Sequence, residues 1–354
     1  MHLSQGSSNN GSRSIFAQAP CRADLAGGTL DLWPLYLFHP GAVTVNFALT
    51  IYTSCRIAPV PGRTIRLRSV DTRKEDAYAN LDDLLASKSH KHELAAQLVK
   101  FFKPEGGFTL ETDSQSPAGA GISGSSAMMI ATTAALAKFS GQKMSLEEMR
   151  VIAQNVEAQL INVPTGCQDY YPALYGGASA IHLTPGGINR EAIDVAPEEI
   201  DQRFLVVYTG APRQSGINNW EVFKAHINGD KKVVKNFETI SEIAQGMHQA
   251  LRKADWDQVA HLLREEWKLR RSNHEGISTP LIDRLIAVAA KTGGRAAKVC
   301  GAGGGGCVIF MVKDGARDRV VEALKINGGE VLSCRVSAEG LTVKTQQATK
   351  AALA

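Results

Sequence analysis

The chain has 354 residues, more than a single ordinary hydrophobic core organises, and this length predicts two packed domains. Its formal net charge of +4, from 39 basic and 35 acidic residues spread along the sequence, is too small to favour a nucleic-acid partner. The composition, 44% hydrophobic and 21% charged, is that of a globular protein, and no apolar stretch is long enough to cross a bilayer, so we expect no membrane partner.

Cysteine and histidine spacing indicates a reduced, cytoplasmic protein. The six cysteines show no CxxC pair, and the nine histidines show neither HxH nor HExxH spacing, so the pattern disfavours a zinc site. Residues 1–14 lack the apolar core of a signal peptide. We expect them, and residues 344–354, to be tails outside the folded domains.

The first informative segment runs from Pro20 to Asp31 and contains a pair of glycines. Around it, residues 15–57 have the pattern of short extended segments, among them a strand at Val43–Ile51. Within it, Arg22 is either the partner of a buried carboxylate or a surface strand residue. Asp31 is either a site residue or a turn former.

The next part of the chain leads from strand to helix through a second glycine segment. Residues 64–70 and 108–112 alternate as strands do, and residues 81–103 have helical spacing. The segment Pro117–Ala127 then alternates glycines and runs directly into a helical pattern over residues 127–139. Strand, glycine loop and helix in this order favour phosphate, because free backbone N–H groups and the positive end of the helix dipole converge there.

This glycine loop therefore predicts a nucleotide site. It is not a Walker A loop, because no GK[ST] follows the glycines, and a serine hydroxyl at the start of the helix is the candidate ligand for Mg²⁺. The alternative is a linker that caps a helix, but a linker needs neither the proline nor the preceding strand. The predicted nucleotide-binding residues are Pro117, Gly119, Ala120, Gly121, Ile122, Ser123, Gly124, Ser125 and Ser126.

Two carboxylates downstream are candidates for phosphoryl-transfer chemistry. A capping-box pattern at Ser145–Glu148 opens a helix toward Leu160 that carries Glu157, the candidate metal ligand. The alternative for Glu157 is a solvated helix face. A turn-rich insert, residues 163–172, carries Asp169, the candidate that orients or deprotonates the acceptor hydroxyl.

The second half of the chain predicts an α+β domain, joined to the first near residues 205–215. Arg213 lies at this junction, where substrates commonly bind. A third glycine segment, Gly301–Gly306, has two interpretations. Its backbone either approaches the nucleotide or the glycine loop Pro117–Ala127 closely, or its glycines only allow steric packing between strands. The predicted strands are residues 175–182, 204–208, 297–300, 308–312 and 331–336, and the predicted helical stretches are residues 217–274, 281–291 and 316–325.

Together, the three glycine segments resemble the signature motifs of the GHMP kinase family, which includes galactokinase, homoserine kinase, mevalonate kinase and phosphomevalonate kinase. The resemblance covers residues 15–343. It is greatest for the sugar-1-kinase branch, especially the kinases of D-glycero-D-manno-heptose 7-phosphate. The segments that carry it are Leu25–Thr29, Gly166–Tyr171, Tyr175–Gly177, Tyr208–Ser215 and Lys298–Gly306.

The resemblance implies a two-domain α+β architecture. The N-terminal domain, residues 15–205, would be like ribosomal protein S5 domain 2, and the C-terminal domain, residues 206–343, would be ferredoxin-like. ATP and Mg²⁺ would bind in the cleft between them. The implied reaction is phosphorylation of a sugar or sugar phosphate, best the anomeric hydroxyl of D-glycero-D-manno-heptose 7-phosphate. Another acceptor (galactose, fucose or mevalonate) or a non-catalytic ligand-binding member is the alternative, and a homodimer is left open.

The resemblance also implies roles for single residues. Asp169 matches the family's catalytic aspartate, Arg22 matches the basic residue that pairs with it, and Glu157 matches the magnesium glutamate. The magnesium serine falls on Ser125 or Ser126. The alignment with the family's motif leaves both serines as candidates, because Gly124 stands where the family has a serine.

On the acceptor side, Asp31 matches a ligand of sugar hydroxyls. Leu30 separates it from Thr29, whereas the heptose kinases usually run Gly-Thr-Asp, so the identity of the sugar stays open. Arg213 is a candidate for binding a second phosphate on the acceptor. The other predicted substrate-binding residues are Gly28, Thr29, Gly303 and Gly304.

Overall fold

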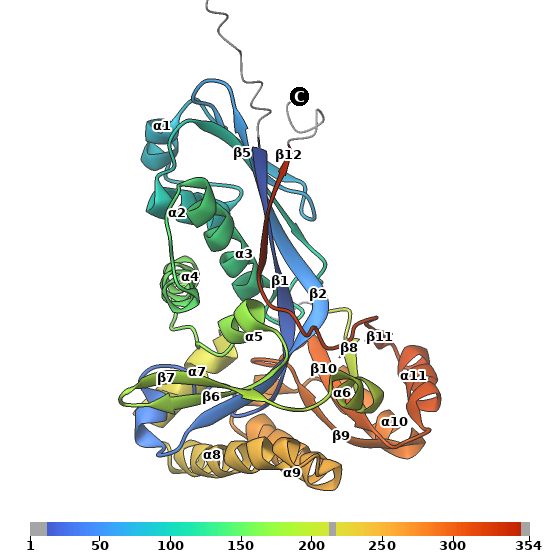
Figure 1. The fold of residues 1–354 in the computed structure, drawn as a ribbon. Helices are drawn as coiled ribbons and strands as arrows, with labels where there is room; N and C mark the ends of the chain where they lie inside the picture. The colour runs from blue at the N-terminus through green and yellow to red at the C-terminus, as the bar shows by residue number, and fades with distance from the viewer. Residues whose placement is uncertain (1–12, 212–216, 348–354) are drawn as a thin grey trace, which may run out of the picture.

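A computed structural model of the chain describes residues 13–211 and 217–347. Two β-sheets organise it (Figure 1). The larger sheet has eight strands, of which six run in the order β12-β1-β2-β5-β3-β4, while β6 pairs with the first part of β2 and with β7. Its strands are β1 (Arg13–Ala26), β2 (Val43–Val60), β3 (Ile65–Ser69), β4 (Lys74–Tyr78), β5 (Gly107–Ser114), β6 (Ala178–Thr184), β7 (Gly187–Ile193) and β12 (Thr342–Gln347).

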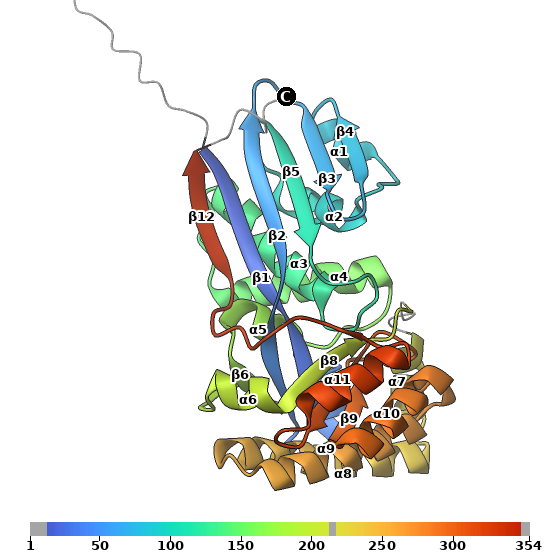
Figure 2. The ribbon, with the colours of Figure 1, turned by 90° about the vertical axis from the view of Figure 1, so that its right-hand side faces the viewer.

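Helices cover one face of the long strands, as Figure 2 shows. Burial along β3 alternates residue by residue, as expected for a sheet that is packed on one side and solvated on the other. The helices in this part of the chain are α1 (Leu81–Ala86), α2 (Glu93–Phe102), α3 (Gly124–Phe139), α4 (Leu146–Ile161) and α5 (Tyr170–Tyr175), with the 3₁₀ turn η1 at Leu35–Phe38.

Helix α3 lies at the centre of this layer. Its residues from Ser126 to Ala137 are all buried, and they are mostly small or unbranched, so α3 packs closely on β1 and β2 and also contacts α4. The helix begins directly after the glycine loop, as predicted. The capping box predicted at Ser145 is present at the start of α4, where the Ser145 hydroxyl accepts from the Glu148 N–H and the Glu148 carboxylate accepts from the Ser145 N–H.

The smaller sheet has the order β11-β8-β10-β9, all antiparallel. Its strands are β8 (Phe204–Tyr208), β9 (Gly294–Val299), β10 (Cys307–Val312) and β11 (Glu330–Val331). The remaining helices are α6 (Pro197–Arg203), α7 (Ile217–Ile227), α8 (Lys231–Arg252), α9 (Trp256–Ser272), α10 (Pro280–Thr292) and α11 (Arg317–Ile326), with the 3₁₀ turn η2 at Glu275–Ile277. Helix α9 packs on β9, while α8 also contacts β1 and β2 of the larger sheet.

Three expectations about local structure are wrong. Residues 15–57 form two long strands rather than short ones, because irregularities after Pro20 and Asp24 bend β1 without ending its pairing with β2. The strand expected at residues 331–336 ends at Val331, where the chain leaves the smaller sheet. Residues 344–347, assigned to a tail, belong to β12 and pair with the start of β1.

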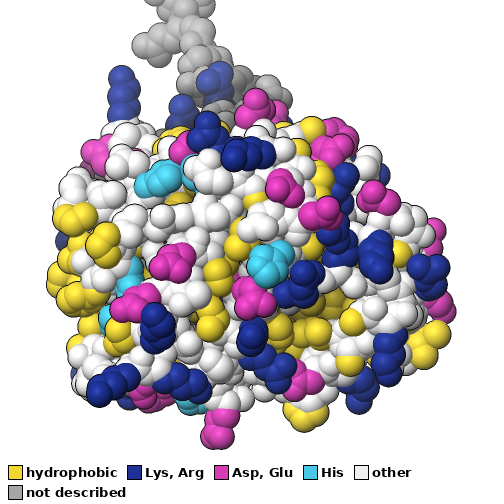
Figure 3. All heavy atoms as spheres, turned by 90° about the horizontal axis from the view of Figure 1, so that it is seen from below, with side chains coloured by type: hydrophobic (Ala, Val, Ile, Leu, Met, Phe, Trp, Pro, Cys, Tyr) yellow, Lys and Arg dark blue, Asp and Glu magenta, His cyan; other side chains and the backbone are white. Residues whose placement is uncertain are grey.

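The charges of this molecule do not gather by sign on the face seen in Figure 3, where Lys and Arg side chains alternate with Asp and Glu side chains. This agrees with the small net charge of +4. Every helix in residues 13–211 and 217–347 is too short or too polar to traverse a bilayer.

Candidate active site

A cleft of about 540 Å³ collects most of the residues that the sequence singled out. It is lined by the glycine loop and the start of α3, by the end of β1 and the turn that follows, by the segment before α5, and by the third glycine segment. Arg213 lies outside the described residues. Of the nucleotide-binding candidates, all but Ile122 line the cleft; Ile122 is completely buried beneath the loop.

Three successive carbonyl groups hold the glycine loop against the protein. The Ala120 carbonyl accepts from the Cys307 N–H, the Gly121 carbonyl from the Arg22 guanidinium, and the Ile122 carbonyl from the Arg22 N–H. In a trans peptide the N–H points away from the preceding C=O. The N–H groups of the residues that follow these carbonyls therefore point away from these contacts, and two of these residues, Gly121 and Ser123, line the cleft.

The start of α3 has no cap of its own. Ser123 stands at the N-cap in a left-handed conformation (φ 64°), makes no side-chain cap hydrogen bond, and its buried Oγ has no partner in the part of the chain that the structure describes. Uncapped N–H groups at a helix start, with the positive end of the dipole behind them, suit a phosphate group. The loop and helix thus fit the polyphosphate of a nucleotide.

Glu157 reaches the same end of α3 from α4. Its Oε2 accepts hydrogen bonds from the Ser126 hydroxyl at 2.9 Å and the Tyr170 hydroxyl at 2.5 Å. Burial raises the pKa of Glu157, and the hydrogen bonds from Ser125, Tyr170 and Ser126 act in the opposite direction. A buried carboxylate beside serine hydroxyls provides the hard oxygen donors that Mg²⁺ prefers. Ser125 is exposed and Ser126 buried, so the two serines differ in their access to solvent.

Asp169 lies at the edge of the cleft, at the start of α5, and is paired with Arg22. The Arg22 Nε and Nη2 both donate to Asp169 Oδ1, at 2.8 and 2.6 Å. Within residues 13–211 and 217–347, Asp169 Oδ2 accepts no hydrogen bond, and this side chain is 24% exposed. Burial would lower the pKa of Arg22, but the charges of Asp169 and Asp24 outweigh burial and raise it. The predicted pairing is therefore present, with one carboxylate oxygen left for a ligand.

Sequence reasoning missed a buried ion pair that joins the two sheets beneath the cleft. The Lys298 Nζ on β9 donates to Asp24 Oδ2 on β1 at 2.5 Å, and both side chains are at most 1% exposed. Asp24 Oδ1 accepts from the Gly301 N–H at 3.1 Å. Although burial acts to raise the pKa of Asp24, the positive charges of Lys298, Arg22 and Arg270 lower it below its usual value. A lysine inside an apolar strand was the signal that a buried partner exists.

Asp31, predicted to bind a sugar hydroxyl, is buried in the wall of the cleft. Its Oδ2 accepts from the Gln168 N–H at 2.9 Å, which ties it to the residue next to Asp169. Burial, followed by the negative charge of Asp169, raises the pKa of Asp31 to about 6. The Gln168 side chain also lines the cleft, and its buried Oε1 has no partner among the described residues.

The turn between β1 and η1 is held by Arg270 of α9. The Arg270 guanidinium donates to the Gly28 carbonyl at 2.8 Å and to the Thr29 hydroxyl at 3.3 Å, while Glu266 balances its charge. The Thr29 hydroxyl in turn donates to Asn219 of α7. Gly28 and Thr29, predicted to bind substrate, line the cleft together with Arg270 and Asn219, which the sequence pattern did not reveal.

The third glycine segment approaches the glycine loop Pro117–Ala127, which is one of the alternatives for its function. A Cβ on Gly306 (φ +73°) would lie 2.6 Å from the Ala120 carbonyl oxygen, so only glycine allows this contact. Gly303 and Gly304, predicted to bind substrate, instead pack against the Ile277 carbonyl and do not line the cleft. The cleft lining here comes from Gly301 and Ala302.

Replacing Gly166 by alanine tests the placement of Asp31. A Cβ at Gly166 would lie 2.0 Å from Asp31 Oδ2, so the buried carboxylate must shift and lose its bond from the Gln168 N–H. We expect Gly166→Ala to lower the free energy of unfolding by about 1–3 kcal/mol, the usual cost of overpacking, measured by urea titration. The control Gly186→Ala, where the nearest atom lies 3.7 Å away, should change it by less than about 0.5 kcal/mol. Equal effects of the two variants would contradict this packing.

The chain matches two family models, the GHMP kinases N terminal domain over residues 90–177 and the GHMP kinases C terminal model over residues 247–330. It is 26% identical over 342 residues to the D-glycero-alpha-D-manno-heptose 7-phosphate kinase of Campylobacter jejuni, an alignment that covers 93% of this chain and 98% of that enzyme. It is also 26% identical over 295 residues to the mevalonate kinase of Thermococcus onnurineus, with coverage of 80% and 83%.

Among solved structures, the D-glycero-D-manno-heptose 1-phosphate kinase of Bacteroides thetaiotaomicron has the same fold. It superposes with a TM-score of 0.76 at 21% identity, over 93% of this chain and 98% of that one. The two domains and the cleft define a small-molecule kinase, a phosphotransferase that uses ATP and an alcohol group as acceptor. The chain belongs to the GHMP kinase family, and the predicted two-domain α+β architecture is confirmed.

Proposed function

We propose that this kinase phosphorylates the anomeric hydroxyl of a sugar phosphate, best D-glycero-D-manno-heptose 7-phosphate. The observation that carries the proposal concerns the carboxylate of Asp169. Its Oδ1 is bound by Arg22 while its Oδ2 is left for a ligand, and it lies in the same cleft as the uncapped start of α3. In this proposal one group of the cleft accepts a hydroxyl proton and another binds phosphate. The full-length similarity to a heptose 7-phosphate kinase supports the choice of sugar.

The glycine loop and the start of α3 bind the nucleotide phosphates in this proposal. Their amides and the helix dipole stabilise negative charge as the γ-phosphoryl group moves. Glu157 and the Ser125 or Ser126 hydroxyl hold Mg²⁺, which supplies charge neutralisation when it is bound. Arg22 links the two halves of the site, because one guanidinium contacts both the glycine loop and Asp169.

Asp169 orients the acceptor hydroxyl and takes its proton on Oδ2. Most of the rate acceleration then comes from position and electrostatics, since phosphoryl transfer demands little covalent chemistry of the protein. Asp31 accepts from a second hydroxyl of the acceptor. Because Asp31 is a buried carboxylate in the cleft wall, it suits a hydroxyl donor of the acceptor, and any phosphate or carboxylate of the acceptor binds elsewhere in the cleft.

A screen of acceptors tests this function. Purified chain with ATP and Mg²⁺ is offered heptose 7-phosphate, galactose, fucose and mevalonate, and ADP release is measured by a coupled assay. We expect kcat/KM for heptose 7-phosphate to exceed that for the other acceptors by at least about 100-fold. Phosphorus NMR of the product should show a phosphate on the anomeric carbon.

The other outcomes separate the alternatives. Preference for galactose or fucose would keep the sugar kinase and overturn the heptose phosphate. Preference for mevalonate would overturn the sugar acceptor. Nucleotide binding without ADP release for any acceptor would favour a non-catalytic member of the family.

A further inference from the structure

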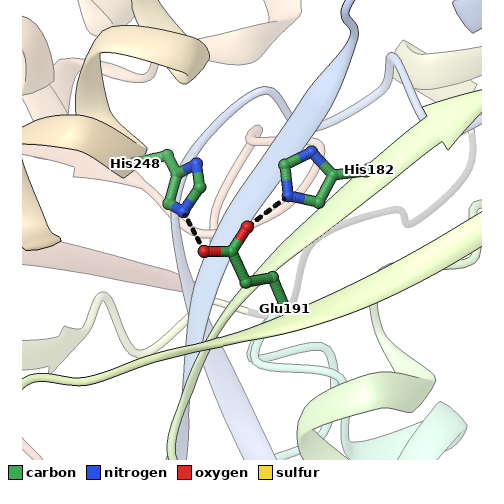
Figure 4. A group of neighbouring side chains, drawn as sticks. All are labelled: His182, Glu191 and His248. Atoms are coloured by element: carbon green, nitrogen blue, oxygen red, sulfur yellow. Dashed lines mark hydrogen bonds and ion pairs between the residues drawn. The ribbon is translucent and has the colours of Figure 1, made fainter.

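A second cluster of side chains lies outside the cleft, where β6 and β7 meet helix α8 (Figure 4). His182 is on β6, Glu191 on β7 and His248 on α8. In the antiparallel register, His182 faces Asn189 and Glu191 faces Ala180, so His182 and Glu191 are diagonal neighbours on one face of the hairpin. His248 reaches them from the helix and is almost completely buried.

The three side chains turn their ligand atoms toward one another. The Nε2 atom of His182 lies 2.9 Å from Glu191 Oε2, and the Nε2 atom of His248 lies 3.2 Å from Glu191 Oε1. All three ligand atoms lie within 4.8 Å of one another. In a tetrahedral Zn²⁺ site with bonds of about 2.0–2.1 Å, neighbouring ligand atoms are separated by about 3.3 Å. The cluster is therefore close to the geometry that such an ion requires.

We propose that His182, Glu191 and His248 bind one Zn²⁺ ion. Two imidazole nitrogens and one carboxylate oxygen are donors that suit Zn²⁺, whereas Mg²⁺ demands six oxygen ligands in an octahedron. Glu191 and His182 are partly exposed, so water completes the coordination. No residue of the cluster lines the catalytic cleft, and this site is independent of the proposed kinase reaction.

The surroundings permit the ion. Burial lowers the pKa of His248, although Glu191 acts against this, and a neutral imidazole is the form that binds a metal. Arg252 lies 3.8 Å from Glu191 Oε1, one turn along α8 from His248. Its side chain is 54% exposed and can move into solvent when a cation replaces it.

Binding would tie two parts of the chain together. His182 and Glu191 belong to the β6–β7 hairpin of the larger sheet. His248 belongs to α8, which comes after β8 of the smaller sheet in the chain. An ion held by both binds only the folded state and therefore stabilises it. The expected role of the site is structural, a clamp between the hairpin and α8.

The test uses the full chain, freed of metal by a chelator and measured without nucleotide. Calorimetric titration with Zn²⁺ should show one ion per chain and a raised melting temperature. His182→Gln, Glu191→Gln and His248→Gln should each weaken binding by at least about tenfold. Even the replacement of a residue that only hydrogen-bonds to a metal ligand lowers metal affinity by about 10–100-fold. The control His261→Gln, at an exposed histidine of α9, should bind Zn²⁺ as the unmodified chain does.

Two further readouts keep the test decisive. Co²⁺ in place of Zn²⁺ should give the visible spectrum of a four-coordinate ion without a thiolate charge-transfer band. Absence of stoichiometric binding, a thiolate band, or unchanged affinity in all three variants would overturn the proposal. Glu191→Gln covers the case in which His248→Gln does not fold, because Glu191 is 41% exposed and its replacement leaves no buried gap.

Discussion

Replacing Asp169 by asparagine is expected to lower kcat by about 10²–10⁴-fold, the usual contribution of a positioned general base. The amide keeps the size of the side chain but has lost the charge and the free oxygen that accepts the hydroxyl proton. Arg22 remains held, because it also donates to the Gly121 carbonyl and lies 3.7 Å from Asp24. The fold and the nucleotide site should therefore survive.

The measurement is steady-state ADP release with the best acceptor, together with the dissociation constant of the nucleotide by calorimetry. The nucleotide constant should change less than about threefold, since among the described residues the Asp169 side chain is hydrogen-bonded to Arg22 and to no group of the glycine loop. Asp113→Asn, at an exposed aspartate of β5, is the matched control and should keep full kcat. An active Asp169→Asn enzyme would remove this residue from the mechanism.

Replacing Lys298 by methionine is expected to lower the free energy of unfolding by about 3–5 kcal/mol, because it leaves the Asp24 carboxylate buried without its main partner. The loss is read from urea unfolding at neutral pH. Lys313→Met, at an exposed lysine just beyond β10, is the control and should cost less than about 0.5 kcal/mol. The double variant Asp24→Asn/Lys298→Met should recover part of the loss, since no uncompensated charge remains.

The pH dependence of the same variant has a definite sign. In the unmodified chain the pKa of Asp24 is lowered on folding, so its contribution to stability is present above the unfolded value of 3.8 and is lost as the pH falls through the folded value. In Lys298→Met, burial would instead favour the protonated acid in the folded state. The difference between the two proteins should shrink as the pH falls from 7 toward 4. A constant difference would mean that packing, and not charge, causes the loss.

The parts of the site that sequence alone revealed are the local ones. The glycine loop and α3 are contiguous, so turn chemistry and helix periodicity predicted both, and Asp169 is recognised by the motif around it. The pair of Asp24 and Lys298 is separated by 274 positions, and only the fold brings it together. The lysine in an apolar strand indicated a partner without naming it.

Predictions failed where the tertiary structure decides between equivalent residues. The third glycine segment has six consecutive positions, and composition cannot tell which of them line the cleft. In the structure Gly301 and Ala302 line it, whereas Gly303 and Gly304 do not. Histidine spacing also could not reveal the group of His182, Glu191 and His248. The cluster around Glu191 has no spacing signature, because its three residues come from two strands and a distant helix.

The docking of Cys307 and Gly306 onto the glycine loop has a consequence for biosynthesis. The loop leaves the ribosome about 190 residues before the strand that holds its Ala120 carbonyl, because Cys307 donates to Ala120. A nascent chain that has completed α3 therefore still lacks a partner for this carbonyl, and long-range contacts of this kind form late. We expect affinity for nucleotide to emerge only once β10 has been translated, so that an incomplete polypeptide does not sequester ATP.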